Sequence, residues 1–216
     1  FGALANILPD RVQADSGMLD LFNVQGRTRD GRGVSSIFFA SGGFGALEGL
    51  DGAPTTPSPS NMTGSSIEVW EDLTGMFVVS KELLADSGGP GEFRGGLGQR
   101  IEFINDSGND IAIACLAGRT EFPPRGVRGG HPGGLREIRV NGETVHPKGR
   151  YLLAPGDRLT LLEAGGGGFG DPRRRDRAAL RRDVEQGFVT AKSAEQYGIQ
   201  QNENGKEILT TDKELE

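Results

Sequence analysis

The residues best suited to chemistry lie in one glycine-rich loop, residues 86–98, with the sequence DSGGPGEFRGGLG. Glycine lets a backbone approach a ligand closely and present concave rows of N–H donors. Asp86 and Arg94 add a carboxylate and a fixed cation, which together predict a site for a small anionic or carbonyl-bearing group. A structural role is the alternative: Asp86 would cap a turn, and Arg94 would pair with Asp86 or Glu92.

Other catalytic motifs are incomplete in this sequence. The glycine blocks do not complete the G-x-G-x-x-G pattern of dinucleotide-binding folds, and Gly205-Lys206 lacks the glycine that a P-loop carries five places earlier. Ala85 stands where a nucleophile elbow has its first glycine. The two histidines, His131 and His146, do not have the spacing of a zinc or iron site. We therefore expect no complete metal site within these residues.

Charge and hydropathy narrow the class of protein. The net charge of -6 and the pI near 5.1 give no general attraction for nucleic acid or an anionic membrane. The longest apolar run, residues 111–117, falls well short of the roughly 18 residues of a membrane helix. Cys115 lies inside this run, which predicts a reduced core thiol and a cytoplasmic protein. The chain starts at Phe1 without a secretory signal, so we expect it to begin inside a longer polypeptide.

The elements that must position the loop are mostly strands. Glycine makes up 36 of the 216 residues, more than twice the usual share of about 7%, and lies mainly in blocks between strand-like runs. The Asn141-Gly142 pair is a strong hairpin signal, and residues 105–109 and 154–157 also predict turns. The predicted strands are residues 34–40, 67–70, 76–80, 100–104 paired with 111–116, 135–140 paired with 143–146, 151–153 and 158–163.

Helical periodicity is concentrated at the carboxy-terminal end. Leu180, Val184 and Phe188 recur every four residues, and a second short helix is predicted up to Gly198. The six arginines of residues 173–182 suggest either a phosphate site or a solvated helix face. A further amphipathic stretch lies at residues 3–8. The prediction is an α+β, β-rich fold over residues 1–198, followed by a polar, mobile tail at residues 199–216.

The glycine loop resembles the D-S-G-G-x-G-x-x-R-G-G-x-G stretch of the hydantoinase B/oxoprolinase family. Other blocks follow in the family's order, so the resemblance extends from Ala3 to Gly198 and is more specific than any single motif. The matching blocks are residues 3–5, 8–12 with Ala14, 42–46, 51–52, Asn61 with Glu68 and Glu71, 86–98, 129–130, 156–157, 165–172 with Arg175, 183–184 with Gly187, and Ala194 with 197–198.

This resemblance implies an ATP-dependent enzyme that opens a cyclic amide or imide such as a hydantoin, 5-oxoproline or a related lactam. Phosphorylation of the amide carbonyl oxygen would activate the carbonyl carbon toward water. The family also implies two protein partners, a hydantoinase A-like subunit or domain that handles ATP and the remainder of this chain's own subunit. The ATP and divalent-metal sites would then lie largely outside these residues. Nucleic acid and membranes are not expected as partners.

The resemblance also suggests roles for individual residues. Hydrolysis of a phosphorylated amide needs stabilisation of an anion and a base. Arg94, with Ser87 and the backbone amides around Gly88, Gly89 and Gly95, is the predicted binding group for the anion. Asp86 or Glu71 is the predicted group that orients a water molecule or a metal-bound ligand.

Two alternatives to an amidohydrolase remain open. Relatives in the family carboxylate ketones such as acetone or acetophenone, a reaction that also activates a carbonyl oxygen by phosphorylation. In the other alternative, this chain is a noncatalytic assembly domain that completes the fold of a larger subunit. In that case, substitutions at Asp86, Glu71 and Arg94 would leave the activity intact.

Overall fold

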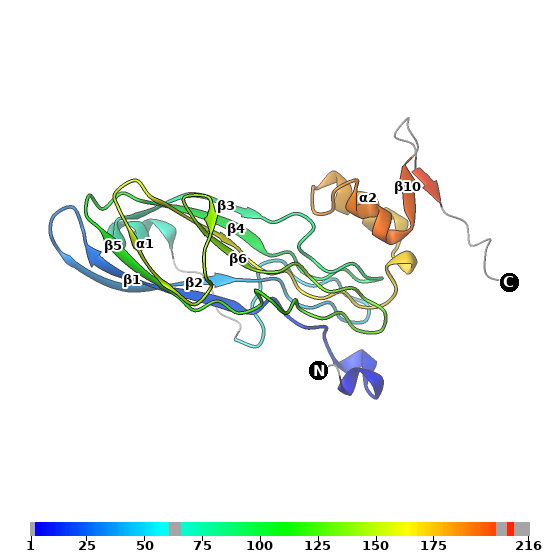
Figure 1. The fold of residues 1–216 in the computed structure, drawn as a ribbon. Helices are drawn as coiled ribbons and strands as arrows, with labels where there is room; N and C mark the ends of the chain where they lie inside the picture. The colour runs from blue at the N-terminus through cyan, green and yellow to red at the C-terminus, as the bar shows by residue number, and fades with distance from the viewer. Residues whose placement is uncertain (1–2, 61–65, 202–206, 210–216) are drawn as a thin grey trace.

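The computed structural model describes residues 3–60, 66–201 and 207–209, and within them two antiparallel sheets pack face to face (Figure 1). The four-stranded sheet has the order β2-β1-β5-β8, and the five-stranded sheet has the order β3-β4-β9-β6-β7. The first comprises β1 (Leu19–Arg27), β2 (Gly33–Ser41), β5 (Ile111–Cys115) and β8 (Arg150–Leu153). The second comprises β3 (Met76–Leu83), β4 (Gln99–Asn105), β6 (Glu137–Val140), β7 (Glu143–Thr144) and β9 (Arg158–Leu162).

Aromatic side chains fill the core between the two sheets. Phe22 of β1, Phe38 of β2 and Phe103 of β4 contact one another and Trp70, with ring centroids 4.8–6.0 Å apart. Trp70 belongs to helix α1 (Ile67–Thr74), so the strand predicted at residues 67–70 is wrong. A run of four residues is too short to distinguish the 3.6-residue period of a helix from the two-residue period of a strand. The helix buries Trp70 and Thr74 and ends at Gly75, whose φ of 71° is left-handed.

A second correction concerns the hairpin predicted around residues 105–109. Strand β4 pairs with β3 and β9, whereas β5 pairs with β1 and β8, so this turn carries the chain from one sheet to the other. Both strands direct alternate buried residues into the same core, which places them across the sandwich from each other. Asn105 holds the crossing, because its side-chain amide donates to the carbonyls of Asn109 and Leu153, each at 2.8 Å.

The β6–β7 hairpin at Asn141-Gly142 is confirmed, with φ angles of 51° and 85° at the two turn residues. Strand β1 was not predicted. Its inward positions include Asp20, while Leu19 and Leu21 point outward, so the apolar alternation that marks a half-buried strand is hidden in its sequence.

The short helices at the carboxy-terminal end confirm the α+β, β-rich prediction. Helix α2 (Arg177–Glu185) and the 3₁₀ turn η4 (Ser193–Tyr197) bury Leu180, Val189, Ala194 and Tyr197 in a second, small core. The remaining elements are η1 (Leu4–Asn6), η2 (Pro9–Arg11), η3 (Pro172–Arg174), β10 (Ile199–Gln201) and β11 (Glu207–Leu209). Strands β10 and β11 pair with each other, and the rest of the predicted tail lies outside the described residues. No helix of the described residues could cross a membrane.

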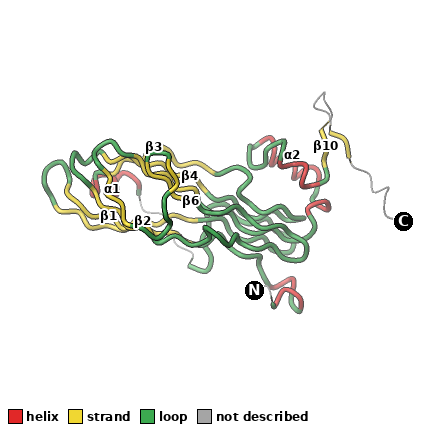
Figure 2. The backbone as a smooth tube through the Cα atoms, viewed as in Figure 1, coloured by secondary structure: helices red, strands yellow, loops and turns green. Residues whose placement is uncertain are grey.

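Between the sandwich and α2, the glycine blocks form a bundle of extended segments that lie side by side (Figure 2). Residues 164–169 run through its centre. The amides of Gly166, Gly167 and Gly168 donate to the carbonyls of Gly96, Asp15 and His131, at 2.8–3.0 Å, so successive amides reach three different segments. Three different partners for three successive amides are compatible with a polyproline II-type chain, which turns every three residues and makes no internal hydrogen bonds.

Only glycine fits at the centre of this bundle. An added Cβ at Gly165, Gly166, Gly167 or Gly168 would lie 1.8–2.2 Å from a backbone oxygen of a neighbouring segment. Those oxygens cannot move without breaking the hydrogen bonds of their own segments. The glycine content of the sequence therefore reflects close packing of backbone against backbone, as it does at the axis of collagen.

We predict that Gly166→Ala destabilises the protein by about 3 kcal/mol or more, because its Cβ would meet the carbonyl oxygen of Phe44 at 2.0 Å. Gly33→Ala in β2 is the matched control, since an added Cβ there has no atom within 4 Å. Denaturant unfolding followed by circular dichroism measures both variants. Equal stabilities would contradict the packing argument.

Candidate functional site

The predicted loop binds the carboxy-terminal helix through a buried ion network. Arg94, 4% exposed, donates from Nε to Asp183 of α2 at 3.2 Å. Arg175 bridges the same Asp183 and Asp51, at 2.7 Å to each. Two cations thus face two carboxylates, which balances the charge of the buried groups.

The network shifts the pKa values of its members. Burial alone would raise the pKa of Asp51, but hydrogen bonds and charge from Arg175 hold it below its usual range. Burial opposes the charged form of Arg175, yet Asp51 and Asp183 raise its pKa. Burial also raises the pKa of Tyr197, whose hydroxyl makes no hydrogen bond to the described residues. Around the network, Asp51 and Arg175 stay ionised and Tyr197 stays neutral near neutral pH.

Asp86 holds the same carboxy-terminal segment from the other end of the loop. Its carboxylate accepts hydrogen bonds from the amide and the hydroxyl of Thr190, each at 2.8 Å, and its own amide donates to Phe188 O. The Arg94 guanidinium lies 5.5 Å from the centroid of the Phe188 ring. Arg94 therefore pairs with Asp183, and the predicted structural pairing with Asp86 or Glu92 is wrong.

Glu71 lies far from this network. It belongs to α1, at the opposite end of the molecule from α2 (Figure 1), and its carboxylate accepts the amide of Val78 at 2.7 Å. The structure therefore brings Asp86 and Arg94 to the same segment and does not bring Glu71 to them. The catalytic roles of the three residues stay predictions.

The predicted binding groups of the loop already have partners inside the glycine bundle. The Ser87 hydroxyl donates to Leu84 O at 2.5 Å and accepts the amide of Gly98 at 2.9 Å. The amides of Gly89 and Gly95 donate to Gly166 O and Gly89 O, at 2.8 and 2.9 Å. An added Cβ at Gly88 would lie 2.1 Å from Gly95 O. A ligand could use the amides of Gly89 and Gly95 only by displacing these hydrogen bonds.

A pocket of about 610 Å³ opens beside the ion network. Arg174, whose side chain is 71% exposed, lies 3.4 Å from Glu92, and Arg182 is an exposed second cation on the pocket wall. Such cations can attract a carboxylate or phosphate group. The described residues contain no cluster of three or more histidine, cysteine or carboxylate side chains that could hold a metal ion. The lining residues are Gly49, Leu50, Asp51, Glu92, Phe93, Arg174, Arg175, Asp176, Ala179 and Arg182.

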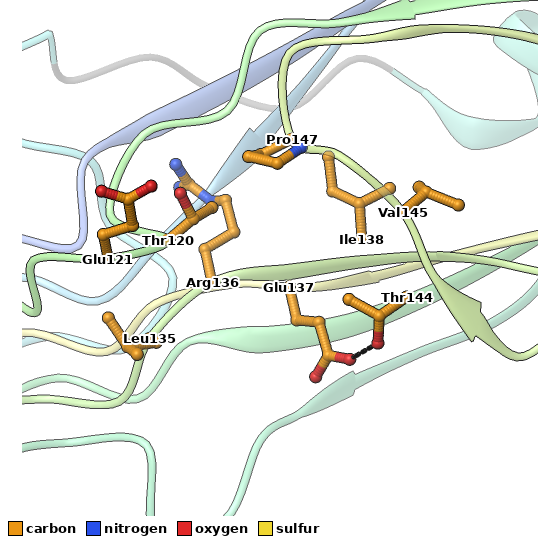
Figure 3. A pocket seen from close by; sticks show the side chains of 9 residues that line it. All are labelled: Thr120, Glu121, Leu135, Arg136, Glu137, Ile138, Thr144, Val145 and Pro147. Atoms are coloured by element: carbon orange, nitrogen blue, oxygen red, sulfur yellow. Dashed lines mark hydrogen bonds between the residues drawn. The ribbon is translucent and has the colours of Figure 1, made fainter.

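Sequence reasoning missed a second buried ion cluster. Arg136 lines a pocket of about 340 Å³ beside the sandwich (Figure 3). It donates from Nε to Glu163 at 2.7 Å, and its Nε lies 3.6 Å from the carboxylate of Asp20. The pKa of Glu163 is raised to about 7, because burial and the charge of Asp20 raise it by more than Arg136 lowers it. One cation between two buried carboxylates thus favours a bound proton. Asp20 occupies an inward position of β1, and a prediction of this strand from the sequence would have indicated a buried carboxylate there.

Comparison with known proteins finds one family and several solved relatives. The Hydantoinase B/oxoprolinase family model matches residues 1–172. The caprolactamase subunit beta of Pseudomonas jessenii is 31% identical over 94% of this chain, which spans 38% of that subunit. The crystal structure of the ATP-dependent caprolactamase from the same organism superposes with a TM-score of 0.82 at 27% identity, covering 94% of this chain and 38% of that one.

A nucleotide-free acetone carboxylase structure shares the fold, with a TM-score of 0.77 at 18% identity, and covers 96% of this chain and 33% of that one. This chain therefore spans between a third and two fifths of the length of these caprolactamase and acetone carboxylase chains.

We predict that Asp183→Asn destabilises the protein by about 3–5 kcal/mol, because it leaves Arg94 and Arg175 buried beside a neutral group. Hydrogen exchange should also speed up in α2 and η4, which this network attaches to the loop. Asp106→Asn is the matched control, because Asp106 is 68% exposed and pairs with an exposed Arg29, and we expect a change within about 0.5 kcal/mol. Unchanged exchange in α2 would contradict the attachment role.

We further predict that Glu163 makes the stability fall as the pH rises. Its pKa is raised on folding from 4.5 to about 7, so its favourable contribution is complete below 4.5 and is lost as the pH passes about 7. The contribution is at most about 3 kcal/mol. Glu163→Gln should remove this dependence on pH. The free energy of unfolding of the variant, measured in urea, should therefore rise relative to that of the wild type between about pH 5 and about pH 8. A constant difference would show that Glu163 does not bind the proton.

Proposed function

The chain belongs to the hydantoinase B/oxoprolinase family, and from that premise we propose that it is part of an ATP-dependent amidohydrolase. Its substrate class is a cyclic amide or imide, such as a hydantoin, 5-oxoproline or a related lactam. The observation that carries the proposal is the similarity to the caprolactamase subunit beta, at 31% identity over 94% of this chain. A hydantoinase A-like subunit or domain, and the rest of this chain's own subunit, complete the assembly.

In this proposal, ATP bound elsewhere in the assembly supplies the phosphoryl group that would be transferred to the amide carbonyl oxygen, which activates the carbonyl carbon. The residues of this chain form part of the surface that borders the active site of the assembly. Arg94 is a positioning residue, because it is buried against Asp183, while the exposed Arg174 and Arg182 attract the anionic group. Asp86 is exposed and orients the attacking water. The divalent metal that the family implies would be held largely by other parts of the assembly, because the described residues offer no ligand cluster for one.

A ketone carboxylase is the second candidate, and the fold shared with acetone carboxylase supports it. The hydrolase is preferred because the caprolactamase structure is more similar, with a TM-score of 0.82 against 0.77 and 27% identity against 18%. Both reactions consume ATP, so ATP hydrolysis alone does not separate them. Their second substrates do.

The test is an assay of the complete assembly with ATP and each of 5-oxoproline, N-methylhydantoin and acetone. We expect ADP and a ring-opened product with a cyclic amide, at a rate independent of bicarbonate. ADP formation that requires acetone together with bicarbonate would instead establish the carboxylase. The metal requirement can be measured in the same assay by adding a chelator.

We predict that Asp86→Asn lowers kcat by about 100-fold in the complete assembly, as expected for loss of a group that orients water. Thr190→Val is the matched control, because it removes a hydrogen bond to the same carboxylate and keeps the carboxylate itself. The control should retain most of the activity. Equal losses in the two variants, or no loss in either, would favour the noncatalytic assembly role for this loop.

A further inference from the structure

The outer face of the four-stranded sheet is almost free of charge. Strand register places Phe39 beside Leu21, and Leu116 follows on the other side of Leu21. Two charged side chains lie on this face: Arg27 at the end of β1, and Arg150 on the edge strand β8, in the row of Asn23 and Ile37. The other outward residues of its rows are Leu19, Asn23, Gln25, Ser35, Ile37, Ala112, Ala114 and Leu152.

Large apolar side chains on this face are exposed to solvent. Phe39 is 38% exposed, Ile37 48%, Leu116 63% and Leu152 66%. They lie on β2, on β8 and directly after β5, and the partly buried Leu21 of β1 lies between β2 and β5. Exposed apolar side chains that gather on one face of a sheet often mark an interaction surface.

The outer face of the other sheet shows that the fold does not require this composition. There Glu102 pairs with Arg100 and Arg158, and Glu137 pairs with Arg139. These charged pairs are typical of an antiparallel sheet with one face in water. The two outer faces thus differ in charge, although the five-stranded sheet also exposes Phe77 and Val79 of β3. The low charge of the four-stranded face fits contact with another polypeptide.

We propose that the outer face of β2-β1-β5-β8 packs against the part of a hydantoinase B-type subunit that this chain does not span. The chain corresponds to 38% of the caprolactamase subunit beta and 33% of the acetone carboxylase chain, so most of such a subunit lies elsewhere. Permanent interfaces are more apolar than transient ones. The partner surface is therefore apolar, with uncharged hydrogen-bonding groups opposite Asn23 and Gln25. This inference rests on family membership and not on the proposed reaction.

The amino-terminal segment adds a second apolar surface. Leu4, Ile7 and Leu8 are 49%, 75% and 47% exposed, and the segment stands away from the sandwich (Figure 1). A second copy of this chain could also cover a flat apolar face, through a two-fold contact. The remainder of the subunit is the preferred occupant because, joined in one polypeptide, it would be present at a high effective concentration.

The test is hydroxyl-radical footprinting of the native assembly, purified through a tag on this chain. Leu116 and Leu152 should be oxidised several-fold less than their exposure in the isolated fold implies, whereas Phe77, 51% exposed on the charged sheet, should be oxidised freely. Full oxidation of Leu116 and Leu152 in the assembly would overturn the proposal. So would cross-links from this face only to a second copy of the chain or to a separate subunit.

Lysine substitutions provide an independent measurement. Leu116→Lys and Ile37→Lys should lower the yield of the native assembly several-fold, because each would bury an unpaired charge in the interface. Phe77→Lys, a matched change at a similarly exposed site, should leave the yield unchanged. The same yield for all three variants would contradict the interface, and the wild-type footprint gives a result even if a variant fails to fold.

Discussion

The close approach of backbones around residues 164–169 is the constraint on which the rest of the structure depends. Each amide of Gly166, Gly167 and Gly168 donates to a different neighbouring segment, and a side chain at any of these positions would strike a carbonyl oxygen. The neighbouring segments come from distant parts of the chain, so one central segment fixes their order. Because the contacts are made by backbone atoms, the bundle depends on the absence of side chains more than on the presence of any particular one.

The buried ions lie where this bundle meets the other two parts of the molecule. Arg136, Glu163 and Asp20 lie at its junction with the sandwich, and Arg136 also donates to the carbonyl of Gly17. Arg94 and Asp183 lie at its junction with α2. The glycine segments have no apolar side chains that could pack against the sandwich or α2. Charged hydrogen bonds therefore make the directional contacts at these junctions. Such pairs specify one arrangement more than they add net stability.

Much of the fold could be predicted because turn chemistry and strand composition are local. Asn141-Gly142 specified the β6–β7 hairpin, and β2 and β3 followed from their β-branched and aromatic residues. The pairing partners of β4 and β5 could not be predicted. Two strands that follow each other in sequence can pair in one sheet or lie in opposite sheets of the sandwich. Both arrangements direct the same residues into the core, and only tertiary packing decides between them. The loop at residues 86–98 was identified, but not its partner Asp183, because nothing in the sequence marks a contact between residues so far apart.

The same glycines that suggest a ligand cradle are, in the structure, donors and acceptors for one another. A glycine-rich loop predicts anion binding only when its amides are free, and those of Gly89 and Gly95 are not. Under the proposed function, chemistry contributed by this chain would come from side chains at the margin of the bundle, where Asp86, Arg174 and Arg182 are exposed. The bundle holds those margins in fixed positions, as the proposed surface bordering a shared reaction would require.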